Sequence, residues 1–238
     1  MKLPSETLPC TFAYNKFCGY CLPNSSLHRP ASKAVQAGRA YERHTIDYMM
    51  ANCGDGDIIH AGAYFGDFLP ALSGAITDGA CIWSFEPNLE NFRCAEITLK
   101  INNLTNVDLT NAGLGEAGSI GYLKTASPNG VSLGGASRVV ANRQAGKPGI
   151  TSIKIVAIDE IVPADRQVSI LQLDVEGYEK AALLDSLALI ERCRPILILE
   201  QLDGGALTDS DWFKRNILSL GYSETAKIHS NVVYCVSR

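Results

Sequence analysis

At 238 residues, of which 46% are hydrophobic, the chain can bury a substantial core, and its length favours a single main domain. The formal net charge of −4 and the pI near 5.6 argue against a general polyanion-binding protein, so we expect no nucleic-acid partner. No apolar stretch approaches the roughly 20 residues that span a bilayer, and no basic-then-apolar signal pattern stands at the N-terminus, so we expect a cytoplasmic protein without membrane contact.

Residues 1–31 are rich in proline, serine, cysteine and aromatic residues without a period, which predicts an irregular extension before a main domain of residues 32–238. Four residues of this extension could supply soft ligands to zinc: Cys10, Cys18, Cys21 and His28. A zinc ribbon would show a second closely spaced pair, so ordinary thiols are the preferred interpretation. The other cysteines are scattered singly, which is typical of reduced thiols inside cells.

The rest of the chain alternates between strand and helix patterns, which is typical of an α/β fold with a parallel sheet. A helix is predicted over Ser32–Asn52. The expected parallel strands are 57–61, 80–85, 106–111, 169–173 and 195–200. Later helices are expected near Gly66, after the capping residue Asn88, over 178–192 and over Asp211–Leu220. Further strands are expected at 153–158, 222–228 and 231–236, the last two as an antiparallel pair.

The first two strands end in residues that suit a nucleoside ligand. The strand at 57–61 leads into a turn with the sequence His60-Ala61-Gly62-Ala63-Tyr64-Phe65-Gly66. Its glycines let the backbone approach a ligand and turn sharply into a helix. The second strand stops at Glu86, which can accept hydrogen bonds from both hydroxyls of a ribose. Because parallel strands present their carboxyl ends at one edge of the sheet, these segments predict an adenosine cofactor.

The composition of the turn indicates which cofactor. A dinucleotide fingerprint requires G-x-G-x-x-G, so that a pyrophosphate can lie on exposed amides at a helix N-terminus. This turn has G-x-x-x-G with two aromatic residues inside it. Such a bulky turn suits a ligand without pyrophosphate, and S-adenosylmethionine is the natural candidate. By itself the pattern leaves open the ordinary turn geometry of another α/β protein.

Further segments extend the pattern, namely F-E-P-N-L-E-N-F at 85–92, L-D-V-E-G-Y-E at 173–179 and the strand that ends at Glu200. With these segments the chain resembles, over roughly residues 41–236, the FkbM family of S-adenosylmethionine-dependent methyltransferases. The resemblance implies a class I methyltransferase fold, a Rossmann-like α/β fold with a seven-stranded, mostly parallel sheet and a C-terminal antiparallel hairpin. His60 and Tyr64 stand where the family usually has an acidic residue and an asparagine.

The strand ends and the resemblance together give the expected cofactor contacts. These are His60, Ala61, Gly62, Ala63, Tyr64, Phe65, Gly66, Glu86, Pro87, Asn88 and Asp174. The ribose contact of Glu86 carries over from the family more directly than contacts to the methionyl end, because His60 and Tyr64 depart from the family pattern. No metal is assigned to the site.

The chemistry requires few further residues. A sulfonium is already a strong electrophile, so the protein has mainly to align the acceptor and, for an alcohol, to remove its proton. The candidate bases are Asp174, Glu176, Glu200 and His60. We favour Asp174 and Glu200 as catalytic, because the strands that they end are adjacent in this topology. A cofactor contact or a helix cap is the alternative role of Asp174, and a cofactor contact is the preferred role of His60.

Residues 124–149 interrupt the alternation with a sequence rich in glycine, serine and asparagine that offers little to pack as a helix. A loop of this length in a compact domain is uncommon unless it is functional or disordered. One interpretation is a lid over the acceptor, with Arg138 or Arg143 facing an anionic group. The other is a solvated excursion.

The leading hypothesis is an enzyme that moves a methyl group from S-adenosylmethionine to a hydroxyl of a small molecule, because the resemblance implies O-methylation. The acceptor would be a sugar or glycan unit or the scaffold of a secondary metabolite. A nicotinamide-dependent oxidoreductase is the first alternative, and the missing third glycine argues against it. A non-catalytic cofactor-binding protein is the second. The sequence leaves open the acceptor and whether the protein forms a homo-oligomer.

Overall fold

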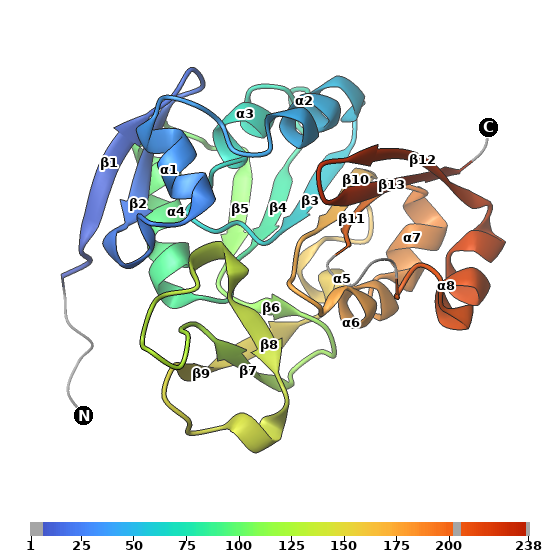
Figure 1. Ribbon diagram of the computed structural model, residues 1–238. Coiled ribbons are helices and arrows are strands. Elements are labelled where there is room, and N and C mark those ends of the chain that lie inside the picture. The colour runs from blue at the N-terminus through green and yellow to red at the C-terminus, as the bar shows by residue number, and fades with distance from the viewer. Residues whose placement is uncertain (1–6, 202–205, 237–238) are drawn as a thin grey trace.

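A seven-stranded sheet forms the centre of the computed structural model, which describes residues 7–201 and 206–236 (Figure 1). Its strand order is β12–β13–β11–β10–β3–β4–β5. The bounds are β3 Asp57–Ala61, β4 Ile82–Phe85, β5 Val107–Thr110, β10 Val168–Leu173, β11 Ile196–Glu200, β12 Tyr222–Ile228 and β13 Asn231–Val236. Strands β3, β4, β5, β10 and β11 are parallel, and β13 is antiparallel to both of its neighbours. The predicted sheet with its C-terminal hairpin is confirmed.

Helices cover both faces of this sheet (Figure 1). Strand residues alternate between the faces, so β3 places Ile58 against one layer and Ile59 against the other. The first layer is formed by α2 Arg43–Asn52 and α3 Leu69–Ser73, and the second by α5 Ile158–Ile161, α6 Glu179–Leu184, α7 Leu187–Cys193 and α8 Asp211–Asn216. A parallel sheet buried on both faces explains why most residues of its strands are apolar. No helix in the described ranges is long and apolar enough to cross a bilayer.

Two of the predicted helices are interrupted. The pattern over Ser32–Asn52 contains α1 Pro30–Gln36 and α2, because the chain ends α1 at Gly38 with φ +71° and Gly38 N–H donates to the Val35 carbonyl oxygen at 2.9 Å. The predicted helix over 178–192 likewise divides into α6 and α7. Gly38 is a helix-end signal that was available in the sequence, whereas the break between α6 and α7 contains neither glycine nor proline.

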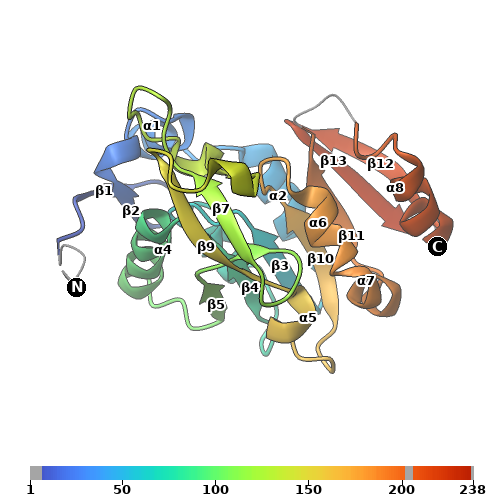
Figure 2. The ribbon, with the colours of Figure 1, turned by 90° about the horizontal axis from the view of Figure 1, so that it is seen from below.

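The N-terminal extension is not irregular, which corrects the expectation for residues 1–31 within the part that the structure describes. Strands β1 Cys10–Tyr14 and β2 Gly19–Pro23 form an antiparallel hairpin beside α4 Leu89–Ile101 (Figures 1 and 2). Tyr20 and Leu22 of β2 are fully buried. Cys21 N–H also donates to Thr98 Oγ1 at 3.0 Å. Each strand is too short for its alternation to show in the sequence, and the packing on α4 supplies the missing stability.

A second sheet covers the carboxyl edge of the first. Its order is β6–β9–β7–β8, with β6 Gly113–Leu114, β7 Ile120–Lys124, β8 Arg138–Val140 and β9 Ile150–Val156. Figure 1 shows this sheet below the central strands, and Figure 2 shows β7 and β9 side by side. The strand predicted at 153–158 corresponds to β9, which begins and ends earlier than predicted. Residues 124–149 are partly ordered in this sheet, since β8 pairs with β7.

Candidate functional site

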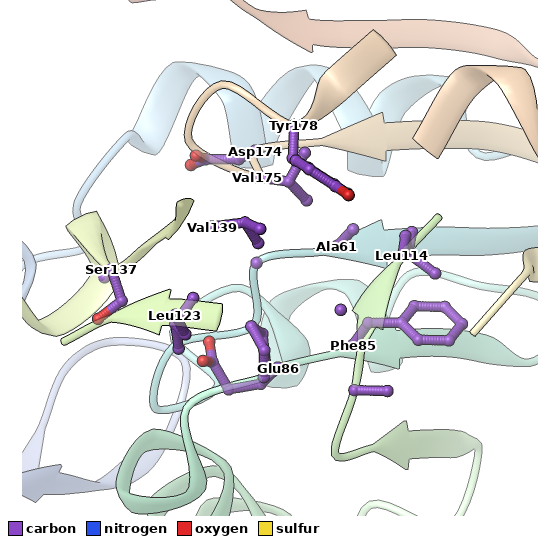
Figure 3. A pocket seen from close by; sticks show the side chains of 15 residues that line it. Ala61, Phe85, Glu86, Leu114, Leu123, Ser137, Val139, Asp174, Val175 and Tyr178 are labelled. Carbon is purple, nitrogen blue, oxygen red and sulfur yellow. The ribbon is translucent and has the colours of Figure 1, made fainter. Parts of the chain in front are cut away.

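Two adjoining cavities open beside the ends of β3, β4 and β10. The first, the apolar cavity, has a volume of about 480 Å³ including its mouth. Its walls include Ala61, Phe85, Leu114, Leu123 and Val139, from both sheets (Figure 3). The second, the acidic cavity, has a volume of about 700 Å³ including its mouth. Gly62, Gly135 and Asp174 line both cavities, so a single ligand can extend from one into the other.

Gly62 stands where the two cavities meet, and only glycine fits there. Its φ is +96°, and a Cβ atom on it would collide with the carbonyl oxygen of Asp174. Gly62 N–H donates to the Phe85 carbonyl oxygen at 3.0 Å, and Asp174 N–H donates to the Ala61 carbonyl oxygen at 3.1 Å. The turn after β3 is thus fixed between the ends of β4 and β10.

Glu86 closes β4 on the side of the apolar cavity opposite Asp174 (Figure 3). It is 4% exposed, and its carboxylate accepts hydrogen bonds from Tyr64 N–H at 2.7 Å and Asn88 N–H at 2.8 Å. Burial raises the pKa of Glu86 to about 7, and those hydrogen bonds limit the rise. Asn88 in turn caps α4, because its Oδ1 accepts from Glu90 N–H at 3.1 Å. The N–H groups orient the carboxylate and leave it acceptor capacity for ribose hydroxyls.

The predicted cofactor residues divide into two groups. Seven of them line one of the cavities: His60, Ala61, Gly62, Tyr64, Glu86, Pro87 and Asp174. The other four, Ala63, Phe65, Gly66 and Asn88, line neither. The Phe65 ring is fully buried and packs edge-on against Tyr20, with centroids 6.0 Å apart. The second half of the turn therefore faces the N-terminal hairpin and α4, which the sequence pattern did not indicate.

Tyr64 links the turn to the N-terminal segment. Its φ of 49° places it in the left-handed region, and its hydroxyl lies 2.7 Å from Ser26 Oγ and 3.1 Å from Ser32 Oγ. The same hydroxyl closely approaches the backbone of Gly134, where a Cβ atom would lie 2.7 Å from it. Residues of three distant segments therefore meet at this ring.

Three carboxylates converge where β10 and β11 end. Single oxygen atoms of Asp174, Glu176 and Glu200 all lie within 4.8 Å of one another. Asp174 and Glu200 are neighbours because Leu173 pairs with Leu199 in the parallel register. The predicted proximity of Asp174 and Glu200 is therefore confirmed, while their catalytic role stays a prediction.

Burial and mutual repulsion make these carboxyl groups hard to ionise. The pKa of Asp174 is raised well above its usual value, first by burial and then by the charge of Glu200. Burial also raises the pKa of Glu200, and burial together with the charge of Glu200 raises the pKa of Glu176 to about 7. Glu176 has φ 53°, a left-handed backbone in the turn that follows β10. The cluster can therefore hold a proton near neutral pH.

His60 lies on the floor of the acidic cavity and is 2% exposed. Its Nδ1 is 3.2 Å from Ser84 Oγ, and its ring centroid is 5.1 Å from that of Phe68. Burial lowers the pKa of His60 to about 4, so its imidazole is neutral at pH 7. A neutral, weakly basic ring favours a ligand contact over the role of general base.

Sequence reasoning missed several residues of the acidic cavity: Arg29, Tyr41, Glu42, Asp67 and Gln172. Gln172 precedes Asp174 by two positions and so shares its strand face, a signal that was available in the sequence. Asp67 directly follows Gly66, and burial raises the pKa of Asp67 to about 7. Glu42 carried no local signal, since the packing of α2 brings it to the cavity.

The four zinc-ligand candidates of the extension are not brought together. Within the described ranges, Asp174, Glu176 and Glu200 form the only group of three or more potential metal ligands with mutually close atoms. Burial raises the pKa of the Cys21 thiol to about 12, and Cys10 and Cys94 are its neighbours. All eight cysteines are free thiols.

The segment 124–149 covers the site. Gly135, Ser137 and Val139 line the apolar cavity, and the Gly134 carbonyl oxygen accepts from Asn91 Nδ2 at 3.3 Å and from Ser137 Oγ at 2.7 Å. Burial raises the pKa of Glu176, and the charge of Arg138 partly opposes that rise. The Arg143 side chain lies outside the described part of the structure. A lid is compatible with this placement and stays a prediction.

Comparison with solved structures shows the same fold. The methyltransferase FkbM from Methylobacillus flagellatus is 19% identical with a TM-score of 0.52, over 76% of this chain and 43% of that one. This chain thus spans less than half the length of that protein. An rRNA methylase from Streptococcus thermophilus (9% identical, TM-score 0.46, 82% and 95% covered) is also similar. So is an S-adenosylmethionine-dependent methyltransferase from Aquifex aeolicus (13% identical, TM-score 0.43, 81% and 87% covered).

Comparison with families is more specific. No curated protein sequence matches the chain. A family model described as the methyltransferase FkbM domain matches residues 60–218, which is more than half of the chain and includes the turn after β3, Glu86, the acidic cluster and β11. The chain therefore belongs to the FkbM methyltransferase family, and its cofactor is S-adenosylmethionine.

Proposed function

We propose that the protein transfers the methyl group of S-adenosylmethionine to a hydroxyl of a small molecule, either a sugar or glycan unit or a secondary-metabolite scaffold. One observation carries the proposal. The neighbouring carboxyl groups of Asp174 and Glu200 stand where the apolar cavity passes into the acidic one, and Asp174 lines both. This is the point at which a cofactor that spans the two cavities would present its sulfonium.

The two cavities suit the two ends of the cofactor. The adenine would lie among the apolar side chains of the first cavity, with the ribose hydroxyls on Glu86. The methionyl end would pass over Gly62 into the acidic cavity, where His60 and Asp67 line the wall. Because Gly62 has no side chain, the ligand can lie directly on the backbone there.

The reaction needs only alignment and one proton acceptor. The acceptor oxygen forms a bond to the methyl carbon while the carbon–sulfur bond breaks, which leaves neutral S-adenosylhomocysteine. The hydroxyl proton passes to a carboxylate of the Asp174–Glu200 pair, whose position at the junction puts it beside the reacting oxygen. A nicotinamide-dependent oxidoreductase is no longer proposed, because the family uses S-adenosylmethionine.

We place the enzyme in the cytoplasm with a small-molecule acceptor as its partner. Eight free thiols support a reducing compartment. Neither a nucleic-acid nor a membrane partner is proposed, in keeping with the net charge of −4. Homo-oligomerisation stays open and can be measured by light scattering.

The test is methyl transfer to a panel of hydroxyl- and amine-bearing acceptors, followed by mass spectrometry and by release of S-adenosylhomocysteine. We expect methylated alcohols. Asp174→Asn should lower turnover by about 10²- to 10⁴-fold and change S-adenosylhomocysteine affinity only a few-fold, as expected on losing a general base. Glu191→Gln, an exposed carboxyl on α7, is the matched control. Methylation of amines alone, or an Asp174→Asn variant with intact turnover and weakened cofactor binding, would contradict the assignment.

A further inference from the structure

The acidic cavity holds more carboxylates than methyl transfer requires. Among the described residues that line it, one carries a permanent positive charge, Arg29, and five are acidic: Glu42, Asp67, Asp174, Glu176 and Glu200. The sulfonium and ammonium of the cofactor can offset part of this charge. An alcohol acceptor brings no positive charge, so the carboxyl groups that remain must either hold protons or be compensated by another ligand.

The three residues at the ends of β10 and β11 have the spacing of metal ligands. One oxygen each of Asp174, Glu176 and Glu200 lies within 4.8 Å of the other two. Oxygen ligands of Mg²⁺ bind at about 2.0–2.1 Å and so lie about 3–4 Å from one another. A small closure of the three side chains, drawn in by the ion itself, would complete the shell on this side.

A separate observation in the same cavity points to a ligand. Gln172 is 2% exposed, and its Oε1 is buried without a hydrogen-bond partner among the described residues. It lines the acidic cavity from the strand face that also carries Asp174. A buried amide oxygen in a native protein is almost always satisfied, so an unpaired one indicates a missing partner. Glu200 Oε2 is likewise buried without a hydrogen-bond partner among the described residues.

We propose that Asp174, Glu176 and Glu200, with Gln172 as a further oxygen donor, bind a divalent cation that in turn holds the oxygens of the methyl acceptor. The donor set contains oxygen alone, which selects a hard cation such as Mg²⁺ or Mn²⁺ over zinc. Such an ion prefers six ligands, so positions remain open towards the cavity. They suit an acceptor with two adjacent oxygens, such as a vicinal diol or an α-hydroxy acid.

This inference rests on the proposed function and gives it a chemical rationale. A hydroxyl bound to a divalent cation loses its proton more readily than a free one, because the cation stabilises the alkoxide. Each carboxylate binds the ion through one oxygen and keeps the other to accept that proton. The ion also removes the repulsion within the acidic cluster, so it stabilises the closed site.

The test measures Mn²⁺ binding to the full chain by equilibrium dialysis and electron paramagnetic resonance, with and without S-adenosylhomocysteine. We expect one bound ion per chain, displaced by Mg²⁺. Glu176→Gln and Glu200→Gln should each weaken Mn²⁺ binding by about tenfold or more, since even outer-shell partners of a metal contribute about 10- to 100-fold. Gln172→Met, of similar volume, should weaken it by about tenfold. Glu191→Gln should bind Mn²⁺ like the unmodified protein.

The variants should stay folded, because Glu→Gln removes repulsion within the cluster, and circular dichroism with S-adenosylhomocysteine titration verifies this. No Mn²⁺ binding at millimolar concentration by protein that binds S-adenosylhomocysteine overturns the metal site and leaves the proposed function intact. Mn²⁺ binding without any binding of S-adenosylhomocysteine supports the site and overturns the proposed function. If the enzyme methylates an amine acceptor at a rate that a chelator does not lower, the acceptor itself supplies the positive charge. That result overturns the proposed metal site.

Discussion

Replacing Glu86 by alanine should separate cofactor binding from folding. The carboxylate is 4% exposed and lines the apolar cavity, where the proposed function puts the ribose hydroxyls. A hydrogen bond to a charged group contributes about 1.5–3 kcal/mol. The Glu86→Ala variant should therefore bind S-adenosylhomocysteine about 10- to 150-fold more weakly at pH 8, where the carboxylate is ionised.

The stability of the ligand-free protein should change much less. The substitution leaves the N–H groups of Tyr64 and Asn88 without their acceptor, at a cost of about 1–3 kcal/mol each. It also removes a buried charge. The pKa of Glu86 rises from 4.5 to about 7, so ionising it in the folded protein costs about 3 kcal/mol at pH 8. These two effects have opposite signs and similar size.

Isothermal titration with S-adenosylhomocysteine and thermal unfolding of the ligand-free protein measure the two quantities. Glu86→Gln is the matched control, since it keeps one acceptor oxygen and should fall between the wild type and Glu86→Ala. The affinity of the wild type for S-adenosylhomocysteine should decline as the pH falls through about 7, because the Glu86 carboxylate takes up a proton there. The negative charge of Asp67 contributes to this raised pKa of Glu86. An unchanged dissociation constant in Glu86→Ala at pH 8 would refute the ribose assignment.

Three further predictions test the glycine turn, the buried ion pair and the covering segment. Gly62→Ala should destabilise the fold far more than Gly54→Ala in urea unfolding. Both glycines have a positive φ, but only at Gly62 would the added Cβ atom collide with another group, the carbonyl oxygen of Asp174. Arg166→Ala should lower the unfolding free energy by about 1.5–3 kcal/mol at pH 7, because it removes the guanidinium 2.7 Å from the 2% exposed Asp57 carboxylate, while Cys81 N–H and Trp83 Nε1 still donate to it. Burial opposes ionisation of Asp57, but Arg166 and the other donors lower the pKa of its carboxyl group below the usual value. The ion pair therefore stabilises the fold above about pH 4, and this stabilisation is lost as the pH falls further. A difference in unfolding free energy between Arg166→Ala and the wild type that does not change with pH would contradict this. If residues 124–149 form a lid, Gly134→Ala should raise the acceptor KM and leave the affinity for S-adenosylhomocysteine unchanged. The control is Gly130→Ala, since Gly130 also has a positive φ but no atom lies near its added Cβ. Equal kinetics in the two variants would argue against a lid.

The sequence was sufficient for the central sheet and for the placement of Glu86 directly after β4. The β3, β4 and β10 segments are short apolar runs that end in glycine or an acid, and such signals are local. The parallel topology then follows from the alternation with helices, and it brings Asp174 next to Glu200 without further information. Gly62 could be assigned because its conformation is a property of one residue and its neighbours along the chain.

Tertiary packing decided the rest. The β1–β2 hairpin is stable because α4 buries Tyr20, a contact between segments about 70 residues apart that no local pattern encodes. Glu42 reaches the acidic cavity from the start of α2, and burial leaves Gln172 Oε1 without a hydrogen-bond partner among the described residues. The raised pKa values of Asp174 and Glu176 likewise depend on burial and on charges from separate strands. Sequence spacing determines which residues can share an edge, but the electrostatic free energy of that edge depends on distances and solvent exclusion that exist only in the folded chain.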